Sequence, residues 1–271
     1  MSPQEQWQIA GSAPESYERY LVPGIFRPWA GDLIEQIALL PGERVLDVAC
    51  GTGIVARLAA QRVGTTGGVT GLDLNGGMVA AARALTASTD VPITWREGRA
   101  DALPCADASF DVVLCQQGLQ FFPDRLAALR EMHRVLVRGG RLALSVWRSL
   151  PHNPYVVALA EAVTRHVSSE AGVTMRAPCA FGDIEALRTI IREGGFRNSC
   201  IRIAVRLLRI QAIEEFILGQ LAATPLAGAI ADLAASRREA LINEISEALR
   251  AHRDDEGVAV PMEAYVVVAQ A

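Results

Sequence analysis

Strand and helix signals alternate along residues 43–147, and this alternation restricts the folds open to the chain more than any other feature of the sequence. Short apolar runs, typical of buried strands, are separated by segments whose apolar residues recur at helical spacing. Repeated alternation predicts an α/β fold with a doubly wound, mostly parallel sheet and right-handed crossovers. The expected strands are 44–48, 69–74, 93–97, 110–115 and 142–147, and the expected helices are 54–61, 78–85 and 124–138.

The pattern resumes beyond residue 182 with a helix at 184–192 and strands at 200–208 and 264–269, which makes seven strands. Segments that leave the carboxyl ends of parallel strands overhang the crevice where ligands bind. Two insertions begin at such ends, and we expect them to form a lid together with an N-terminal helix. The predicted division is an N-terminal helical lid segment (1–30), a core in three pieces (31–147, 183–208 and 262–271) and two lid insertions (148–182 and 209–261).

Composition narrows the function classes. A formal charge of −4 gives no basic footprint for nucleic acid. No apolar run is long enough to span a bilayer, and residues 1–15 lack the layout of a signal peptide, so we expect a cytoplasmic protein without a membrane partner. The five cysteines form no Cys-x-x-Cys pair and the four histidines are scattered, so no metal site is expected.

All 26 basic residues are arginine. A standard Walker A loop needs Gly-Lys-Ser/Thr, and pyridoxal-phosphate enzymes need a Schiff-base lysine, so both classes are excluded. The commonest nicotinamide-dependent oxidoreductases with a Tyr-x-x-x-Lys site are disfavoured for the same reason.

A Gly-rich turn follows the first strand, in the sequence Asp47-Val48-Ala49-Cys50-Gly51-Thr52-Gly53. Glycines let the backbone approach a ligand closely, and the following helix offers its free N–H groups. Asp73 ends the second strand, where a carboxylate can accept both hydroxyls of a ribose. Together these features predict an adenosine-type ligand.

Two such ligands fit the turn itself. Residues 51–56 match the dinucleotide pattern Gly-x-Gly-x-x-Ala, so the glycine spacing alone does not decide between them. Asp47 does, because a carboxylate at the mouth of the turn would repel a pyrophosphate but suits an ammonium group such as that of a methionine moiety.

Five ordered motifs carry a family resemblance. They cover about residues 40–147 and are Val45–Gly53, Gly71-Leu72-Asp73-Leu74, Gly98-Arg99-Ala100-Asp101-Ala102-Leu103-Pro104, Phe110-Asp111-Val112-Val113, and Arg134-Val135-Leu136-Val137-Arg138-Gly139-Gly140. The set resembles the class I S-adenosylmethionine-dependent methyltransferases, in particular the small-molecule branch that includes the ubiquinone and menaquinone C-methyltransferases. One departure is Ala49, where many members have glycine.

The resemblance implies a Rossmann-like seven-stranded sheet whose last strand is antiparallel, and S-adenosylmethionine as cofactor. Asp47 and Gly51 would face its methionine end and Asp73 its ribose. The implied cofactor-binding residues are Asp47, Ala49, Gly51, Gly53, Asp73, Leu74, Met78, Asp101, Ala102, Cys115, Gln116 and Tyr20. Within this set Leu74 and Met78 would flank adenine, Asp101 and Ala102 would bond its amino edge, and Cys115 and Gln116 would offer backbone carbonyls to the ammonium group. Taken singly, Asp73 can be an ordinary strand-end acid, Met78 a core residue and Asp101 a turn cap.

The acceptor side carries weaker signals. His152, just beyond the fifth strand, is the best-placed general base, although a surface-loop histidine fits the same position. The expected substrate-pocket residues are Tyr17, Phe26, Trp29, Gln117, Phe121, Arg148, Tyr155 and Phe181. The segment after the fourth strand lacks Asn/Asp-Pro-Pro-Tyr/Phe, which disfavours DNA or protein-amide methylation.

The sequence therefore predicts methyl transfer to a small apolar or aromatic metabolite, as in secondary metabolism. A cofactor-binding protein without transferase activity, such as a cyclase or regulator, stays open, because a cofactor motif reports binding rather than turnover. A homodimer also stays open.

Overall fold

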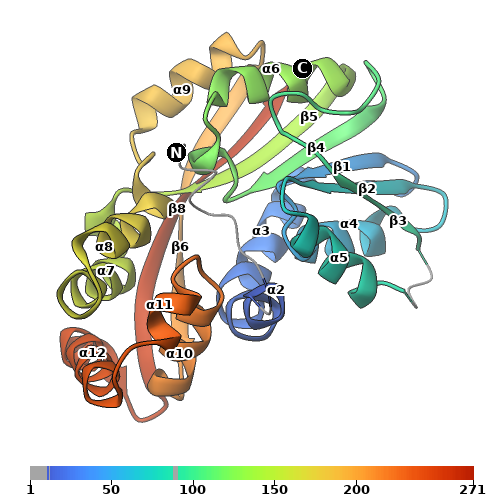
Figure 1. The fold of residues 1–271 in the computed structure, drawn as a ribbon. Helices are drawn as coiled ribbons and strands as arrows, with labels where there is room; N and C mark the ends of the chain where they lie inside the picture. Colours follow the sequence, from blue (N-terminus) through green and yellow to red (C-terminus); the bar gives the residue numbers. More distant parts are fainter. Residues whose placement is uncertain (1–10, 12, 88–90) are drawn as a thin grey trace.

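A computed structural model describes residues 11, 13–87 and 91–271. The sheet has the strand order β3-β2-β1-β4-β5-β8-β6, with the short β7 paired to β8 at its edge (Figure 1). The strands are β1 (Arg44–Val48), β2 (Gly68–Asp73), β3 (Ile93–Glu97), β4 (Phe110–Gln116), β5 (Leu136–Trp147), β6 (Arg197–Ile210), β7 (Arg253–Asp254) and β8 (Gly257–Gln270). Strands β1 to β5 pair in parallel, whereas β8 runs antiparallel to both β5 and β6.

This topology confirms the predicted α/β fold with a mostly parallel sheet and an antiparallel last strand. The boundaries of the last two long strands differ from the prediction. Strand β8 begins at Gly257 rather than near residue 264, and β6 continues to Ile210 rather than ending at 208. The stretch 209–261 is therefore helical only in its middle, because its two ends pair with each other as extended strand, Arg209 opposite Ala259.

Helices cover both faces of the parallel strands. Helices α3 (Arg27–Ile37), α4 (Ile54–Val63) and α5 (Gly76–Leu85) pack against one face, and α6 (Arg125–Val135) and α9 (Ile184–Glu193) pack against the other. Successive residues of a strand point to opposite faces, so Val45 belongs to the first cluster and Leu46 to the second. Because both faces of the central strands are buried, β4 is buried continuously from Val112 to Gln116, whereas β3 nearer the edge keeps exposed charged residues.

One helix boundary was predicted wrongly. Asp124 does cap α6 by accepting a hydrogen bond from the Ala127 N–H at 2.8 Å, but the helix ends at Val135 instead of continuing to residue 138. Leu136 already pairs with Phe110 of β4 as the first residue of β5. A tertiary strand pairing thus overrides the helical spacing of these residues.

The short 3-10 helix η2 (Leu119–Phe121) packs on the same face of the sheet as α6. The remaining helices form a separate layer. They are α2 (Ala13–Ser16), the π-helix η1 (Tyr17–Phe26), η3 (Leu150–His152), α7 (Pro154–His166), α8 (Ser169–Arg176), η4 (Ala177–Cys179), α10 (Ile213–Ala222), α11 (Ala227–Ala231), α12 (Ala235–Ala248) and η5 (Arg250–His252). Figure 1 shows α7, α8 and α10 to α12 gathered around the part of β6 and β8 that extends beyond the parallel strands. Residues from η1, α7, α10, α12 and β8 share one apolar cluster. None of the helices in the described ranges is long and apolar enough to cross a bilayer.

Candidate active site

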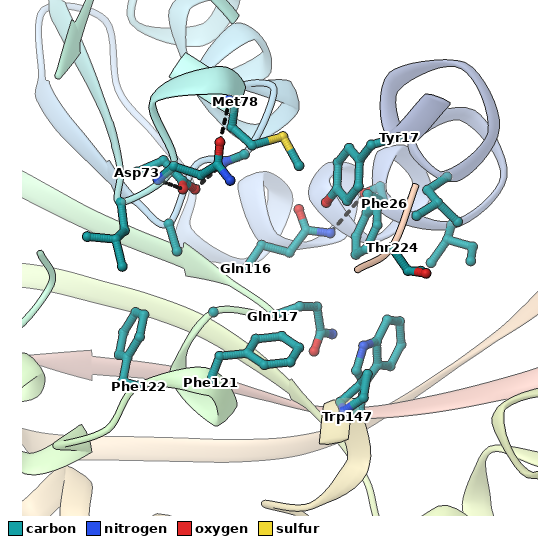
Figure 2. Close-up of a pocket in the computed structure, with 18 of the residues that line it drawn as sticks. Tyr17, Phe26, Asp73, Met78, Gln116, Gln117, Phe121, Phe122, Trp147 and Thr224 are labelled. Atoms are coloured by element: carbon teal, nitrogen blue, oxygen red, sulfur yellow. Dashed lines mark hydrogen bonds between the residues drawn. The ribbon is translucent and has the colours of Figure 1, made fainter. Parts of the chain in front are cut away.

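A cavity lies where the carboxyl ends of β1, β2 and β4 meet this helical layer (Figure 2). One end is formed by the Gly-rich turn and β2, through Ala49, Gly51, Leu72, Asp73, Leu74, Asn75, Met78, Gly98 and Ala100. The other end is formed by the helical layer and β8, through Leu21, Ile25, Phe26, Tyr155, Val156, Pro178, Gln220, Thr224 and Met262. Tyr17 of η1 lies at the first end, because a Cβ on Gly51 would be 3.7 Å from its ring. Between them lie Gln116, Gln117, Gly118, Phe121, Phe122 and Trp147.

The Gly-rich turn adopts left-handed backbone conformations in quick succession. Ala49 has φ +58°, Gly51 +55° and Gly53 +86°. A Cβ on Gly53 would lie 2.2 Å from the ring of Trp95, so only glycine fits there. Ala49 adopts the same left-handed conformation, which is sterically unfavourable for a residue with a Cβ. This explains why many members of the methyltransferase family that the sequence resembles have glycine at this position.

Asp73 fixes the turn from the end of β2. One carboxylate oxygen accepts the Gly51 N–H at 2.8 Å and the other accepts the Asn75 N–H at 2.9 Å. Burial raises the pKa of Asp73, while these backbone N–H groups oppose that shift. A carboxylate can accept about four hydrogen bonds, so Asp73 keeps acceptor capacity toward the cavity that it lines.

Asp47 lies beneath the turn rather than at its mouth. Its side chain is fully buried, and one oxygen accepts the Ala56 N–H in the first turns of α4 at 3.0 Å. The other oxygen has no hydrogen-bond partner among the described residues. The geometry corrects the expectation that Asp47 faces a ligand ammonium group, since the residue anchors the turn to the helix and stands outside the cavity wall.

This burial gives a prediction for pH. Burial raises the pKa of Asp47 well above its usual range, so the folded chain keeps a proton that the unfolded chain releases near pH ~4. Stability from this group is therefore lost as pH rises from that value through the folded pKa. We expect Asp47→Asn to gain stability relative to the wild type as pH increases from 4 to neutrality, measured by urea unfolding across this range.

Asp111 provides the opposite control. Its hydrogen bonds from Arg44 hold its pKa below the usual range. Asp111→Asn should therefore lose stability relative to the wild type as pH rises from the lowered folded pKa to the unfolded value of about 4, and the difference should stay constant above that pH. Parallel pH profiles for the wild type and Asp47→Asn would contradict the assignment of a buried, protonated carboxyl.

Polar contacts tie the N-terminal helices to the turn. Glu18 of η1 accepts hydrogen bonds from Thr52 Oγ1 at 2.5 Å and from Arg57 at 2.7 Å. The Gln116 side chain at the end of β4 donates to the Phe26 carbonyl at 2.9 Å. These contacts hold one wall of the cavity against the carboxyl ends of the strands, and Figure 2 shows the Gln116–Phe26 bond at the centre of the site.

Several predicted residues come together in the cavity wall. Of the expected cofactor set, the wall contains Ala49, Gly51, Asp73, Leu74, Met78 and Gln116. Of the expected substrate set it contains Tyr17, Phe26, Gln117, Phe121 and Tyr155. Tyr17 and Phe26 stack with ring centroids 5.0 Å apart, so the predicted N-terminal contribution to the cavity comes from an aromatic pair.

The other predicted cofactor residues lie elsewhere. Asp47, Gly53 and the fully buried Cys115 support the turn and β4 from behind, and the Tyr20 ring packs against Gly219. Asp101 forms an ion pair with Arg99 at 2.7 Å outside the wall, and the Ala102 N–H donates a hydrogen bond to the Arg99 carbonyl at 3.3 Å. From the same segment, Gly98 and Ala100 line the cavity wall.

The expected acceptor-side residues divide in the same way. Arg148 pairs with Glu263 and Phe181 lies under Arg125, whereas Trp29 is buried edge-on against Trp147. His152 stands outside the wall, 38% exposed, with Nδ1 3.7 Å from Glu263. Its predicted role as a general base has no support from this position.

Sequence reasoning missed most of the lid side of the wall. Trp147, Val156, Gln220, Thr224 and Met262 come from five different elements or loops and share no motif. The sequence did contain a signal for Trp147. Successive strand residues point to opposite faces, so the pocket residue at the end of this strand is Trp147 and not the predicted Arg148, one position later.

The comparisons with known proteins agree with this architecture. Residues 46–144 match the methyltransferase domain family. The chain is 42% identical over 124 residues to a ubiquinone/menaquinone biosynthesis C-methyltransferase of Xanthomonas campestris, which covers 44% of this chain and 47% of that protein. It is 37% identical over 134 residues to the 2-phytyl-1,4-naphtoquinone methyltransferase of Synechococcus elongatus, covering 49% and 56%.

The chain thus aligns with about half the length of these relatives. The match of residues 46–144 to the methyltransferase domain family confirms the predicted resemblance to class I methyltransferases.

Solved structures show the same fold over most of the chain. The YcgJ protein from Bacillus subtilis superposes with a TM-score of 0.59 at 20% identity, covering 89% of this chain and 97% of that one. Haemonchus contortus phosphoethanolamine N-methyltransferase 2, in complex with S-adenosylhomocysteine, gives 0.60 at 18%, covering 95% and 56%. The [4+2]-cyclase SpnF gives 0.54 at 21%, covering 90% and 80%. At these identities the likeness shows the fold alone.

Proposed function

We propose that this protein binds S-adenosylmethionine and transfers its methyl group to a small apolar or aromatic metabolite. The observation that carries the proposal is a single cavity in which a Gly-rich turn with a strand-end carboxylate faces a wall of aromatic and aliphatic side chains. The first half suits an adenosine ligand and the second an apolar acceptor.

The residues of the first half fit the cofactor. Asp73 has free acceptor capacity for ribose hydroxyls, and Leu74 and Met78 offer apolar surface for adenine. The left-handed backbone at Ala49 and Gly51 leaves room for the methionine portion. When bound, this cofactor supplies an electrophilic methyl group on its sulfonium.

The chain's own contribution is alignment and exclusion of water. The described wall contains no histidine or arginine. Of its tyrosines, Tyr155 is fully buried and Tyr17 is partly buried, and desolvation raises the pKa of each above its usual value. The site therefore favours an acceptor atom that is nucleophilic without a strong protein base. The names of the two quinone-pathway relatives support a ring compound of this kind.

The proposal is tested by two measurements on the full chain. Calorimetry should detect S-adenosylmethionine binding, and incubation with methyl-labelled cofactor and reduced naphthoquinones should give a labelled product by mass spectrometry. No binding at millimolar cofactor would overturn the proposal. Binding without transfer to any ring acceptor would favour the non-transferase alternative. A cytoplasmic location and a homodimer belong to the proposal as well, and fractionation and light scattering test them.

We expect Glu18→Gln to weaken cofactor binding severalfold. The substitution removes the charge that holds Thr52 of the turn and Arg57 of α4 to the N-terminal helices, and a partly buried charge-assisted bond contributes about 1.5–3 kcal/mol. Glu215→Gln is the control, because its contact with Arg19 is 4.0 Å long and exposed. Equal calorimetric affinities for the two variants would contradict a role of Glu18 in positioning the turn.

A further inference from the structure

The cavity wall is almost free of charge. Asp73 is the one charged residue in the part of the wall that the structure describes, and it lies at the end assigned to the cofactor. Arg148, which follows the wall residue Trp147, directs its guanidinium to Glu263 instead. An anionic group buried at the lid end would therefore have no cation to compensate its desolvation, which costs several kcal/mol.

Most polar groups at the lid end are already bonded within the chain. The Tyr155 hydroxyl donates to Gln220 Oε1. Thr224 Oγ1 donates to the Leu221 carbonyl at 2.7 Å and accepts the Leu226 N–H at 3.2 Å. These groups close the end of the cavity and need no ligand to satisfy them.

Gln117 is different. Its residue is 5% exposed, its Oε1 accepts a hydrogen bond from Gln120 at 3.3 Å, and its Nε2 has no partner among the described residues. Its backbone is held at φ +53°, in the left-handed region, while its N–H donates to the Ser145 carbonyl at 2.9 Å. Figure 2 shows the amide on the cavity wall between Phe121 and Trp147. A strained backbone that presents an unsatisfied buried amide to a cavity indicates a ligand contact.

We propose that the acceptor is an electrically neutral ring compound with a carbonyl or hydroxyl oxygen, and that the Gln117 side-chain amide binds this oxygen. This rests on the proposed function and adds the charge class of the acceptor and the residue that orients it. Phe121 and Trp147 provide the apolar surface for the ring on either side of the amide. Acceptors with a carboxylate or phosphate are disfavoured by the same wall.

Three small ring probes test the proposal on the full chain without cofactor. Naphthalene, 1-naphthol and 1-naphthoate share one ring system and carry no oxygen, a neutral oxygen and a charged carboxylate at pH 7. By equilibrium dialysis we expect 1-naphthol to bind about tenfold more tightly than naphthalene, the effect of one hydrogen bond. We expect 1-naphthoate to bind at least about a hundredfold more weakly than 1-naphthol, because its charge is buried without a partner.

Two variants assign the selectivity to Gln117. Gln117→Leu should bring 1-naphthol to the affinity of naphthalene while leaving naphthalene unchanged. Gln117→Gly removes the amide and also relaxes the left-handed backbone, so it provides the same test in a chain that keeps its fold if leucine is not tolerated. Thermal unfolding of each variant reports whether the fold is kept.

The proposal is overturned by any of three results: 1-naphthoate binding as tightly as 1-naphthol, no detectable binding of 1-naphthol at millimolar concentration, or an unchanged preference for 1-naphthol in both variants. Calorimetry with S-adenosylmethionine on the same wild-type samples distinguishes a failure of the Gln117 proposal from a failure of the proposed methyltransferase function. A chain that selects 1-naphthol but does not bind the cofactor would overturn the methyltransferase proposal and leave the role of Gln117 standing.

Discussion

Asp73→Ala should lower the affinity for S-adenosylmethionine by at least about a hundredfold. The carboxylate lines the cavity, and hydrogen bonds from ribose hydroxyls to a buried charged acceptor contribute about 1.5–3 kcal/mol each. The substitution also removes the acceptor for the Gly51 and Asn75 N–H groups, so the turn loses its anchor to β2. Both effects act in the same direction, and titration calorimetry measures their sum.

Asp101→Ala is the matched control for this loss. Asp101 is another carboxylate beyond the end of a neighbouring strand, but its oxygens pair with Arg99 outside the cavity wall. We expect less than a threefold change in cofactor affinity. A loss comparable to that of Asp73→Ala would instead support the family-based assignment of Asp101 to the adenine edge and contradict the geometry of the site.

Gly53→Ala should be the most destabilising single substitution in the turn. Its Cβ would lie 2.2 Å from the Trp95 ring, and its φ of +86° is unfavourable for alanine. The left-handed conformation costs about 1–2 kcal/mol and overpacking about 1–3 kcal/mol. We therefore expect a loss of about 3 kcal/mol in the free energy of unfolding, measured in urea, with a weakened cofactor affinity because the turn must shift.

Gly42→Ala separates the two contributions. Its φ of +87° matches that of Gly53, but the nearest atom to its Cβ, in Thr66, would be 3.6 Å away, an ordinary contact. It should lose only the backbone contribution, about 1–2 kcal/mol. If the two glycine substitutions cost the same, the contact with Trp95 is not what requires glycine at position 53.

The parts predicted from sequence are those encoded within one contiguous unit. The strand, turn and helix around Gly51, and Asp73 at the end of the next strand, lie within about thirty residues, and their spacing follows from the βαβ geometry. The same locality explains why the fold class and the direction of the strands were predictable. Ala49 and Gly51 could be placed in the site because the turn itself brings them there.

The lid side was not predictable in this way. Val156, Gln220, Thr224 and Met262 come from segments far apart in the chain, and no periodicity marks a residue as facing a cavity. Whether a polar residue is free also depends on distant partners. Arg148 looked like a pocket residue, but Glu263, contributed by the last strand, takes up its charge.

Asp47 shows a further limit. Its position in the motif is correct, but a motif does not say which side of the turn a side chain occupies. Burial and the contact with Ala56 come from packing of α4 on β1, which only the assembled sheet defines.

Strand β8 makes the two ends of the cavity differ in how they form. Strands β1 and β2 beside the Gly-rich turn are joined by a short crossover, whereas Arg141 of β5 pairs with Gln270 and Trp147 pairs with Ala264. Pairings between residues so distant in the chain carry a larger loop-closure entropy and form slowly. The cofactor end of the cavity thus depends mainly on contacts between near neighbours in sequence. The lid end, which includes Met262 of β8, depends on the pairing between the most distant parts of the chain in the sheet. Changes that weaken the pairing of β8 with β5 should therefore impair recognition of the acceptor before that of the cofactor.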